Sequence, residues 1–125
     1  MASKEYKEYT DQKNYRAIFE NQKEKLLEVF EGDLIFPYNG GYFILGPQLF
    51  FEIKMYIDEE KSIATLLDLN RNPIDIKNLN EFFLETRSKY TEALNKYKMG
   101  LTRLKKSRMI PTLIKLHDLE DDVED

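Results

Sequence analysis

The stretch LIFPYNGGYFILG, residues 34–46, predicts a β-hairpin near the first third of the chain. Asn39 and Gly40 stand between two apolar runs, and both residue types tolerate the positive φ angles that a two-residue hairpin turn requires. Pro37 has no amide hydrogen to donate, so residues 34–36 should form a short strand at a sheet edge. The segments that open and close the chain differ from this hairpin, because their apolar residues recur at helical spacing.

Two segments place apolar side chains in steps of three and four residues, which is typical of one face of an α-helix. The first stripe is Tyr15, Ile18, Phe19, Gln22, Leu26, Val29 and Phe30, and the second is Leu79, Phe83, Thr86, Tyr90, Ala93, Tyr97, Gly100 and Leu104. Each stripe needs a cover, so we expect two long antiparallel helices with these rows buried against each other. Gly100 within the second stripe indicates either a close backbone approach or a bend.

The first helix should begin at Ser3 or Thr10 and end at Glu31. Gly32 follows directly, and it would supply the left-handed position that ends many helices. Few apolar residues precede Tyr15, so the opening of this helix is the part with the least support from periodicity.

The second helix should begin at Asn78, because Glu81 three residues later completes a sequence that resembles a capping box. We expect it to continue to Ser107 or Arg108. Pro111 lies just beyond and is expected to stop it, since proline cannot donate the hydrogen bond that a helix interior requires.

Residues 47–60 fit two secondary structures. Leu49, Phe51, Ile53, Met55 and Ile57 alternate as in a strand, whereas Leu49, Phe50, Ile53, Tyr56 and Ile57 share one helical face. A short helix is favoured, because Pro47 suits a first helical turn and the segment is long for a strand. The strand remains the alternative.

The following stretch LLDLNRNPIDI, residues 66–76, reads as a second hairpin. Strands 66–69 and 74–76 would flank a turn at residues 70–73, where asparagine and proline are concentrated. The predicted fold is therefore α+β, with two long antiparallel helices flanking a small antiparallel sheet of hairpins. We expect one domain over residues 1–110 and a tail, apolar and then acidic, over residues 111–125.

The residue types that support catalysis or metal binding are scarce. The chain has no cysteine, which excludes disulfides, thiolate metal sites and thiol nucleophiles. Its single histidine, His117, lies in the tail with nothing to orient it as a general base. Asp68, Asn70 and Asn72 match the start of a calcium loop, but Pro73 replaces the required glycine and the loop's final glutamate is missing, so a turn is favoured. We expect a protein that is not an enzyme, with no metal and no cofactor.

The net charge of −4 conceals a strongly basic stretch. No acidic residue occurs between Ala93 and His117, and acidic residues dominate from Asp118 onward. A site for phosphate or for an acidic partner is predicted at Arg103, Lys105, Lys106 and Arg108, and the acidic tail could mask it. The alternative is a solvated helix end, where the macrodipole favours cations.

The apolar part of the tail predicts a partner-binding segment. Its anchors are Ile110, Leu113, Ile114 and Leu116, which precede the acidic flank as in many short docking motifs. These side chains could equally fold back onto the domain's own core. The chain has no signal-peptide pattern and no long apolar run, so we expect a soluble protein that does not enter membranes.

The segments NYRAIFENQ (residues 14–22), PYNGG (37–41), LLDLNRNPIDI (66–76) and residues 90–104 together resemble small uncharacterised proteins of T4-like tailed phages. The resemblance covers most of residues 14–108. It implies a virion-associated or assembly component, a scaffold or accessory protein, located in the virion or the host cytoplasm. Such a protein would pack against other phage proteins or against its own copies. The order of helix, small sheet and helix is also similar in topology to prefoldin-type chaperone subunits.

The basic stretch supports a second function. Basic residues interleaved with Tyr90 and Tyr97 could combine phosphate contacts with base stacking, so a small regulator that binds nucleic acid or the transcription or replication machinery is the alternative. The tyrosines fall within the apolar stripe and the overall pI is about 5.2, which favours the protein-packing function.

Overall fold

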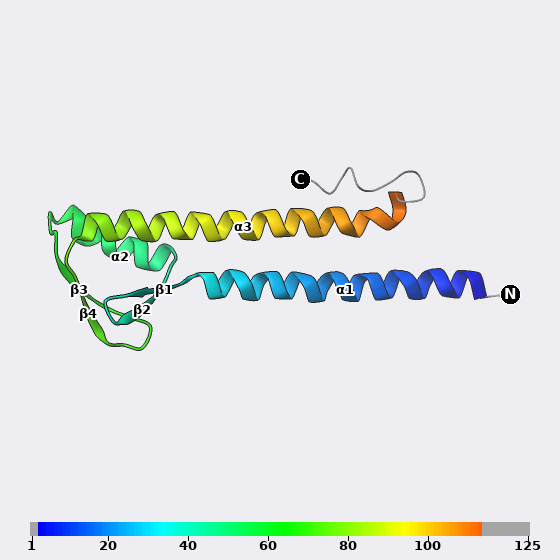
Figure 1. The fold of residues 1–125 in the computed structure, drawn as a ribbon, viewed down its shortest axis with the longest axis horizontal. Coiled ribbons are helices and arrows are strands. Elements are labelled where there is room, and N and C mark those ends of the chain that lie inside the picture. The colour runs from blue at the N-terminus through cyan, green and yellow to red at the C-terminus, as the bar shows by residue number, and fades with distance from the viewer. Residues whose placement is uncertain (1–2, 114–125) are drawn as a thin grey trace. The chain divides into compact units, whose positions relative to one another are not determined.

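The computed structural model describes residues 3–113, with side chains over residues 13–107. The elements are α1 (Ser3–Asp33), β1 (Ile35–Tyr38), β2 (Gly41–Ile44), α2 (Pro47–Asp58), β3 (Ala64–Leu67), β4 (Pro73–Ile76) and α3 (Leu79–Leu113) (Figure 1). The two long helices pack together, and each pair of strands forms an antiparallel hairpin. The predicted α+β class is therefore confirmed.

The chain divides into two compact units. The helical unit comprises the described parts of residues 1–29 and 97–125, which belong to α1 and α3. The hairpin unit comprises residues 30–96, with both hairpins, α2 and the first half of α3. The single domain predicted over residues 1–110 stays a prediction.

The first hairpin forms as the sequence predicts. Asn39 and Gly40 have φ angles of 49° and 85°, the left-handed conformation that this tight turn requires. The register pairs Phe36 with Phe43, and both rings are buried. Pro37 lies on β1 opposite Tyr42 in a sheet of two strands, both of which are edges.

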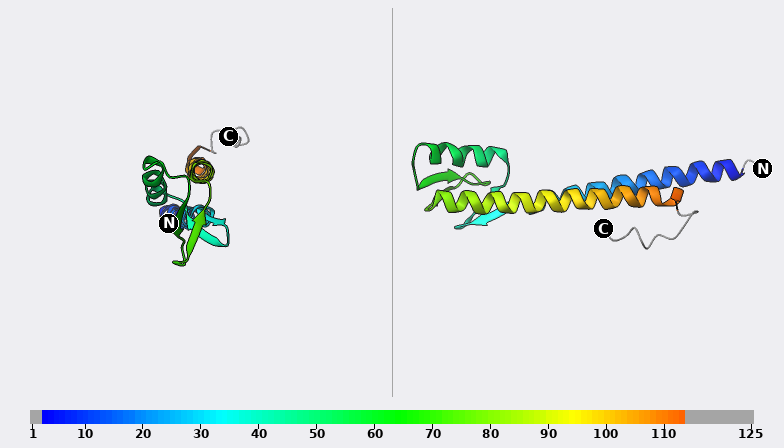
Figure 2. Two further views of the ribbon diagram at one scale, coloured as in Figure 1. Left: turned by 90° about the vertical axis from the view of Figure 1, so that its left-hand side faces the viewer. Right: turned by 90° about the horizontal axis from the view of Figure 1, so that it is seen from above.

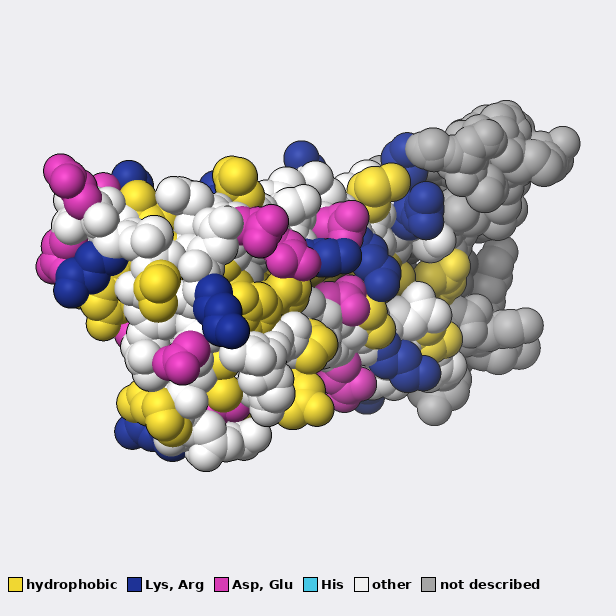
Figure 3. All heavy atoms as spheres, turned by 60° about the vertical axis from the view of Figure 1, so that its left-hand side comes forward, with side chains coloured by type: hydrophobic (Ala, Val, Ile, Leu, Met, Phe, Trp, Pro, Cys, Tyr) yellow, Lys and Arg dark blue, Asp and Glu magenta, His cyan; other side chains and the backbone are white. Residues whose placement is uncertain are grey.

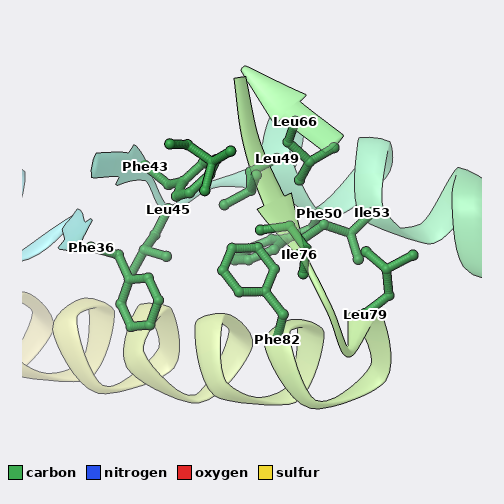
Figure 4. Close-up of a cluster of buried hydrophobic side chains, with 11 residues drawn as sticks. Phe36, Phe43, Leu45, Leu49, Phe50, Ile53, Leu66, Ile76, Leu79 and Phe82 are labelled. Atoms are coloured by element: carbon green, nitrogen blue, oxygen red, sulfur yellow. The ribbon is translucent and has the colours of Figure 1, made fainter. Parts of the chain in front are cut away.

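The aromatic ring of Phe82 on α3 lies within the hydrophobic core of the hairpin unit. Figure 4 shows Phe82 pointing from α3 toward the hairpins, and its ring makes edge contacts with Phe36, Tyr38 and Phe43 at centroid distances of 4.7–6.0 Å. The complete buried cluster consists of Phe36, Phe43, Leu45, Leu49, Phe50, Ile53, Leu66, Ile74, Ile76, Leu79 and Phe82. Phe82 is not part of the predicted stripe, because that stripe steps from Leu79 directly to Phe83.

Residues Pro47–Asp58 form the helix that the sequence favours. Pro47 lies in the first turn, where its missing amide hydrogen costs no helical hydrogen bond. Phe50 is buried between α2 and α3, where its ring meets Tyr90 at 5.4 Å and the Arg87 guanidinium lies 5.0 Å from its centroid. The strand alternative for this segment is wrong.

Both long helices end later than predicted. Gly32 does not adopt a positive φ, and α1 continues to Asp33, where the Leu34 amide still donates to the Phe30 and Glu31 carbonyls at 3.2 Å. The chain therefore enters β1 without a left-handed cap. At the other end α3 includes Pro111 and continues to Leu113, since a proline removes one hydrogen bond but does not necessarily end a helix.

The start of α3 agrees with the sequence. The Asn78 side-chain oxygen accepts a hydrogen bond from the Glu81 amide at 3.0 Å, which is the predicted N-cap. The second hairpin is shifted by two residues at its first strand, β3, and Pro73 begins β4 instead of closing the turn. Proline is tolerated there because it occupies the first position of an edge strand.

The two predicted stripes face each other only in part. In the hairpin unit, Leu79, Phe83 and Tyr90 pack against the hairpins and α2, and the buried cluster includes no residue of α1. In the helical unit the stripes do meet, through Phe19 and Leu26 on α1 and Gly100 and Leu104 on α3. Part of the second stripe is thus covered by the hairpins and α2 instead of α1. Helical periodicity shows that a face needs a cover but does not show which element supplies it.

Candidate interaction site

The helical unit buries little of its apolar surface. Of the side chains described there, over residues 13–29 and 97–107, Phe19 and Leu104 alone are buried, each with an exposed fraction of 8%. Ile18 is 54% exposed and Val29 is 47% exposed, although both belong to the predicted stripe. Two helices side by side, as Figure 2 shows them, cover only one strip of each other. The apolar stripe of α1 is therefore wider than the strip that α3 covers.

The two helices are in close contact at Gly100. A Cβ atom at this position would lie 2.8 Å from Leu26 Cδ2, so the Leu26 side chain occupies the space that a side chain at residue 100 would need. The sequence left a close backbone approach or a bend open at Gly100, and the contact with the Leu26 side chain favours the close approach. Because Leu26 faces Gly100 while Phe19 lies near Leu104 and Ser107, the helices run antiparallel.

A groove lies along one side of this helix pair. It has a volume of about 360 Å³ and is lined by Tyr15, Ile18, Phe19, Gln22, Leu104 and Ser107. Its lining is mainly apolar, and it contains both buried side chains of the unit and the exposed Ile18. A partly open apolar groove between two helices is a common binding site for an amphipathic segment.

The rim of the groove is basic. Arg103 is four residues before the groove residue Ser107 and Lys25 is three residues after Gln22, so each lies beside the groove on its own helix. Both side chains are exposed. Lys106 is exposed as well, but it lies about 160° around α3 from Leu104 and about 100° from Ser107, so it is not part of the rim.

Two acidic residues of α1 whose side chains are described, Glu20 and Glu24, are directed away from the groove. At 100° per residue, Glu20 and Glu24 lie about 160° and 120° around α1 from Ile18. Residues 97–107 of α3 contain no acidic residue at all. The three ion pairs of the described chain, Lys54–Asp58, Lys89–Glu92 and Asp33–Lys96, all belong to the hairpin unit. The groove therefore presents positive charge around an apolar floor.

The predicted phosphate site is only partly assembled. Arg103, Lys105 and Lys106 are exposed, but Lys105 is two residues from Arg103 and lies on a different side of α3. These residues are also not at a helix end, because α3 continues to Leu113, so the macrodipole does not account for them. The side chain of Arg108 lies outside the described residues.

The predicted docking anchors cannot be placed as side chains. Ile110 and Leu113 belong to the backbone of α3, but their side chains lie outside the described residues. Ile114 and Leu116 lie wholly outside the part of the chain that the structure describes. Docking by these four residues stays a prediction.

The sequence did not identify Ile18 and Gln22 as part of a groove. Periodicity shows which residues share a helix face, but it does not show which of them a neighbouring helix leaves uncovered.

In the turn that resembles a calcium loop, the Asp68 carboxylate holds the backbone together by hydrogen bonds. Asp68 is 5% exposed, and its Oδ1 accepts hydrogen bonds from the amides of Asn70 at 2.9 Å and Asn72 at 2.8 Å. Its Oδ2 accepts a third hydrogen bond, from the Tyr42 amide in β2 at 3.0 Å. Both carboxylate oxygens thus serve backbone donors, and the turn interpretation is supported by these contacts.

These hydrogen bonds also set the acidity of Asp68. The hydrogen bond from Asn72, followed by that from Tyr42, lowers the pKa of this carboxyl below its ordinary value, although burial acts in the opposite direction. The charged form is therefore the one that the fold stabilises. Gly41 makes this arrangement possible, because a Cβ there would lie 2.9 Å from Asp68 Oδ2 and 2.7 Å from Ile74 Cγ1.

The part of the chain whose side chains are described shows no metal centre. Over residues 13–107 there is no cluster of three histidine, cysteine, aspartate or glutamate side chains arranged to hold a metal ion. Exposed apolar residues also occur on the hairpin unit, among them Ile35, Tyr42 and Ile44 on the outer face of the first hairpin. Figure 3 shows such hydrophobic side chains interspersed with charged ones.

The comparisons with known proteins give no match: no family model fits the sequence, and neither a curated protein nor a solved structure is significantly similar to it. Within the described chain, none of the helices combines the length and apolar character needed to cross a membrane.

Proposed function

We propose that this protein is a non-enzymatic interaction protein that acts by packing the groove of its helical unit against another protein segment. The observation that carries the proposal is the excess of apolar surface in that unit, where Phe19 and Leu104 are buried while Tyr15 and Ile18 remain 40% and 54% exposed. Exposed apolar side chains that line a common groove favour association, because covering them removes them from water.

The biological setting of this proposal comes from the resemblance to T4-like phage proteins. We propose a virion-associated or assembly role, as a scaffold or accessory component whose partners are other phage proteins or further copies of this chain. The hairpin unit supports such a role by providing a densely packed body of which Phe82 and Ile53 are 1% and 0% exposed. A protein that combines such a body with an uncovered helical surface is suited to work by contact alone.

Site-specific photo-crosslinking in the full chain tests the packing surface. A photoreactive residue at Ile18 should yield covalent adducts with a partner protein or a second copy, identified by mass spectrometry. The matched control carries the same residue at Glu24, which is exposed on another side of the same helix. Adducts of equal yield from both positions, or none from Ile18, would overturn the groove as the interaction surface.

Nucleic-acid binding is the second candidate, and exposed Arg103, Lys105 and Lys106 without an ion-pair partner among the described residues favour it. Retention on DNA or RNA should then weaken with salt. Lys105→Ala with Lys106→Ala should lower the salt slope by about 2, because each lysine would neutralise one phosphate. The control pair Lys61→Ala with Lys77→Ala removes the same charge from the hairpin unit. Equal retention of both variants would exclude this function.

A further inference from the structure

We propose that the segment bound in the groove of the helical unit is an amphipathic helix that runs parallel to α1 and carries carboxylates in its last turn. This inference rests on the proposed function, because it specifies the partner of the same groove. It is based on three features of the groove, namely its helical walls, the spacing of its lining residues and the position of its charges.

The walls of the groove favour a helix over an extended segment. The lining residues belong to positions 15–22 of α1 and 104–107 of α3, at least six residues from either end of these helices. The backbone amides there donate to carbonyls of the preceding helical turn, so they are not available to an extended backbone. A helix pairs its own backbone groups and docks through its side chains, so it is the segment that these walls accept.

The row that α1 contributes to the groove has the spacing of a helix–helix contact. Tyr15, Ile18 and Gln22 are separated by three and then four residues, and they span about 10 Å, or two helical turns. Phe19 and Leu104 form the buried floor, whereas Ile18 is more than half exposed. A partner helix with apolar residues at the same steps would cover Ile18 and complete a packing of three helices.

Two cations, one from each helix, flank the same end of the groove. Leu26 contacts Gly100 across the helix pair. Because the helices are antiparallel, Arg103 lies about 4.5 Å from this contact toward Gln22, and Lys25 directly precedes Leu26. Neither cation has an ion-pair partner among the described side chains. The Gln22 end of the groove is therefore the positive end.

Among the described side chains, no cation faces the groove at its other end. Lys13 and Arg16 are nearest in the chain, but they lie about 140° and 160° around α1 from Ile18. The C-terminal end of a docked helix carries partial negative charge, and carboxylates in its last turn add to this charge. Such a helix binds with its last turn beside Lys25 and Arg103, so it runs parallel to α1.

Charge favours a partner of this kind over a second copy of the chain. A two-fold interface presents the same patch on both sides, so a copy would bring Lys25 and Arg103 beside its own apolar row. Glu28, the next acidic residue of α1, lies about 120° around the helix from Gln22 and about 9 Å beyond it. A copy therefore supplies cations where the groove attracts carboxylates.

Two fluorescent peptides of equal composition test the direction of the bound helix. Both are alanine-based, about 18 residues long and blocked at both ends, with leucines at steps of three and four residues. One carries two glutamates in its last turn, and the other carries them in its first turn.

Fluorescence anisotropy with the full chain should show about fivefold tighter binding of the peptide with glutamates in its last turn, because two ion pairs at an exposed rim have a modest effect. The macrodipole stabilises the other peptide as a free helix, so helicity would not produce this preference. Equal affinities of the two peptides, or binding of neither, would overturn the inference.

Matched double variants test the two cations. Lys25→Ala with Arg103→Ala should abolish the preference between the peptides. The control Lys105→Ala with Lys106→Ala removes the same charge outside the groove rim and should preserve it. If both double variants lose the preference equally, the cations at the rim do not orient the helix.

A photo-crosslinker at Gln22 separates this inference from the proposed function. Adducts with the peptide that has glutamates in its last turn should map to its C-terminal half, as a helix parallel to α1 requires. Adducts that map to the N-terminal half, or crosslinks at Gln22 between two copies of the chain, overturn this inference alone. If no peptide, partner or second copy reacts at Gln22 or Ile18, the proposed function fails as well.

Discussion

The hairpin unit and the helical unit use their apolar residues differently. In the hairpin unit, two hairpins and α2 cover the first half of α3 and enclose a buried cluster of 11 residues. In the helical unit, two helices cover each other along one strip, and only Phe19 and Leu104 are buried among its described side chains. A sheet or a third element can close a core, whereas a helix pair leaves a flank of each helix exposed. We therefore expect the hairpin unit to carry most of the stability and the helical unit most of the binding surface.

The largest expected effect is the loss of the ring at the centre of the hairpin unit. Phe82→Ala should lower the free energy of unfolding by about 3–5 kcal/mol, because the cavity would lie among Phe36, Tyr38 and Phe43. Urea unfolding followed by far-UV circular dichroism measures it. The control Phe51→Ala removes a ring that is 70% exposed, and it should change the free energy by less than about 0.5 kcal/mol. Similar losses for both rings would contradict the assignment of the core.

The same substitution at two glycines compares the units directly. Gly41→Ala should destabilise the protein by about 1–3 kcal/mol, because the new methyl group would lie within 3 Å of the buried side chains of Ile74 and Asp68. Gly100→Ala also meets a side chain, Leu26, but this leucine is half-buried and can move. The gain in helix propensity, about 1 kcal/mol, should offset much of the cost.

Hydrogen exchange locates these two effects. Gly41→Ala should accelerate exchange within residues 34–76, and Gly100→Ala should leave that range unchanged. A larger effect from Gly100→Ala would show that the helical unit is the more tightly packed of the two.

Acid should weaken the hairpin unit through Asp68. Its pKa is lower in the folded state than in the unfolded chain, so the unfolded state binds more protons as the pH falls. The stabilisation is complete above about pH 4, the ordinary range of an aspartate, and is lost as the pH falls through the lowered pKa. When urea unfolding is measured at a series of pH values from neutral to acidic, the unfolding midpoint of Asp68→Asn should be lower than that of the natural protein at neutral pH. It should also change less as the pH falls. The control Glu59→Gln, at an exposed position, should keep the natural slope.

The smallest expected effect on stability is in the groove. Ile18→Ser should change the free energy of unfolding by less than about 0.5 kcal/mol, because this side chain is 54% exposed. Calorimetry should show a nearly unchanged unfolding temperature, while capture of the partner by the crosslinker at Gln22 should fall. A large loss of stability would mean that Ile18 is buried in the folded protein and is not available for binding.

Local signals predicted the elements where short-range chemistry decides them. Asn39 and Gly40 specify the first turn, Asn78 caps α3, and Pro47 opens α2, because each acts on a backbone within a few residues of itself. The two helix ends were predicted less well. Neither Gly32 nor Pro111 ends its helix, since each residue permits or favours termination and does not enforce it.

The candidate site was less accessible to sequence reasoning than the fold. Periodicity identified Tyr15, Ile18, Phe19 and Gln22 as one face but did not indicate that this face is covered unevenly. The basic residue Arg103 was identified, whereas its position beside an apolar groove depends on where α1 lies against α3.

The sequence by itself determined the α+β class, the positions of both hairpins and the two long helices, because turn chemistry and apolar spacing act locally. Only the tertiary structure decided what covers each apolar stripe. The reason is that burial depends on contacts between residues far apart in the chain. Phe82 contacts Phe36 and Phe43 in the hairpin unit, and the Tyr42 amide of the first hairpin donates a hydrogen bond to Asp68 of the second. The same long-range packing leaves Ile18 exposed on a helix whose Phe19 is buried.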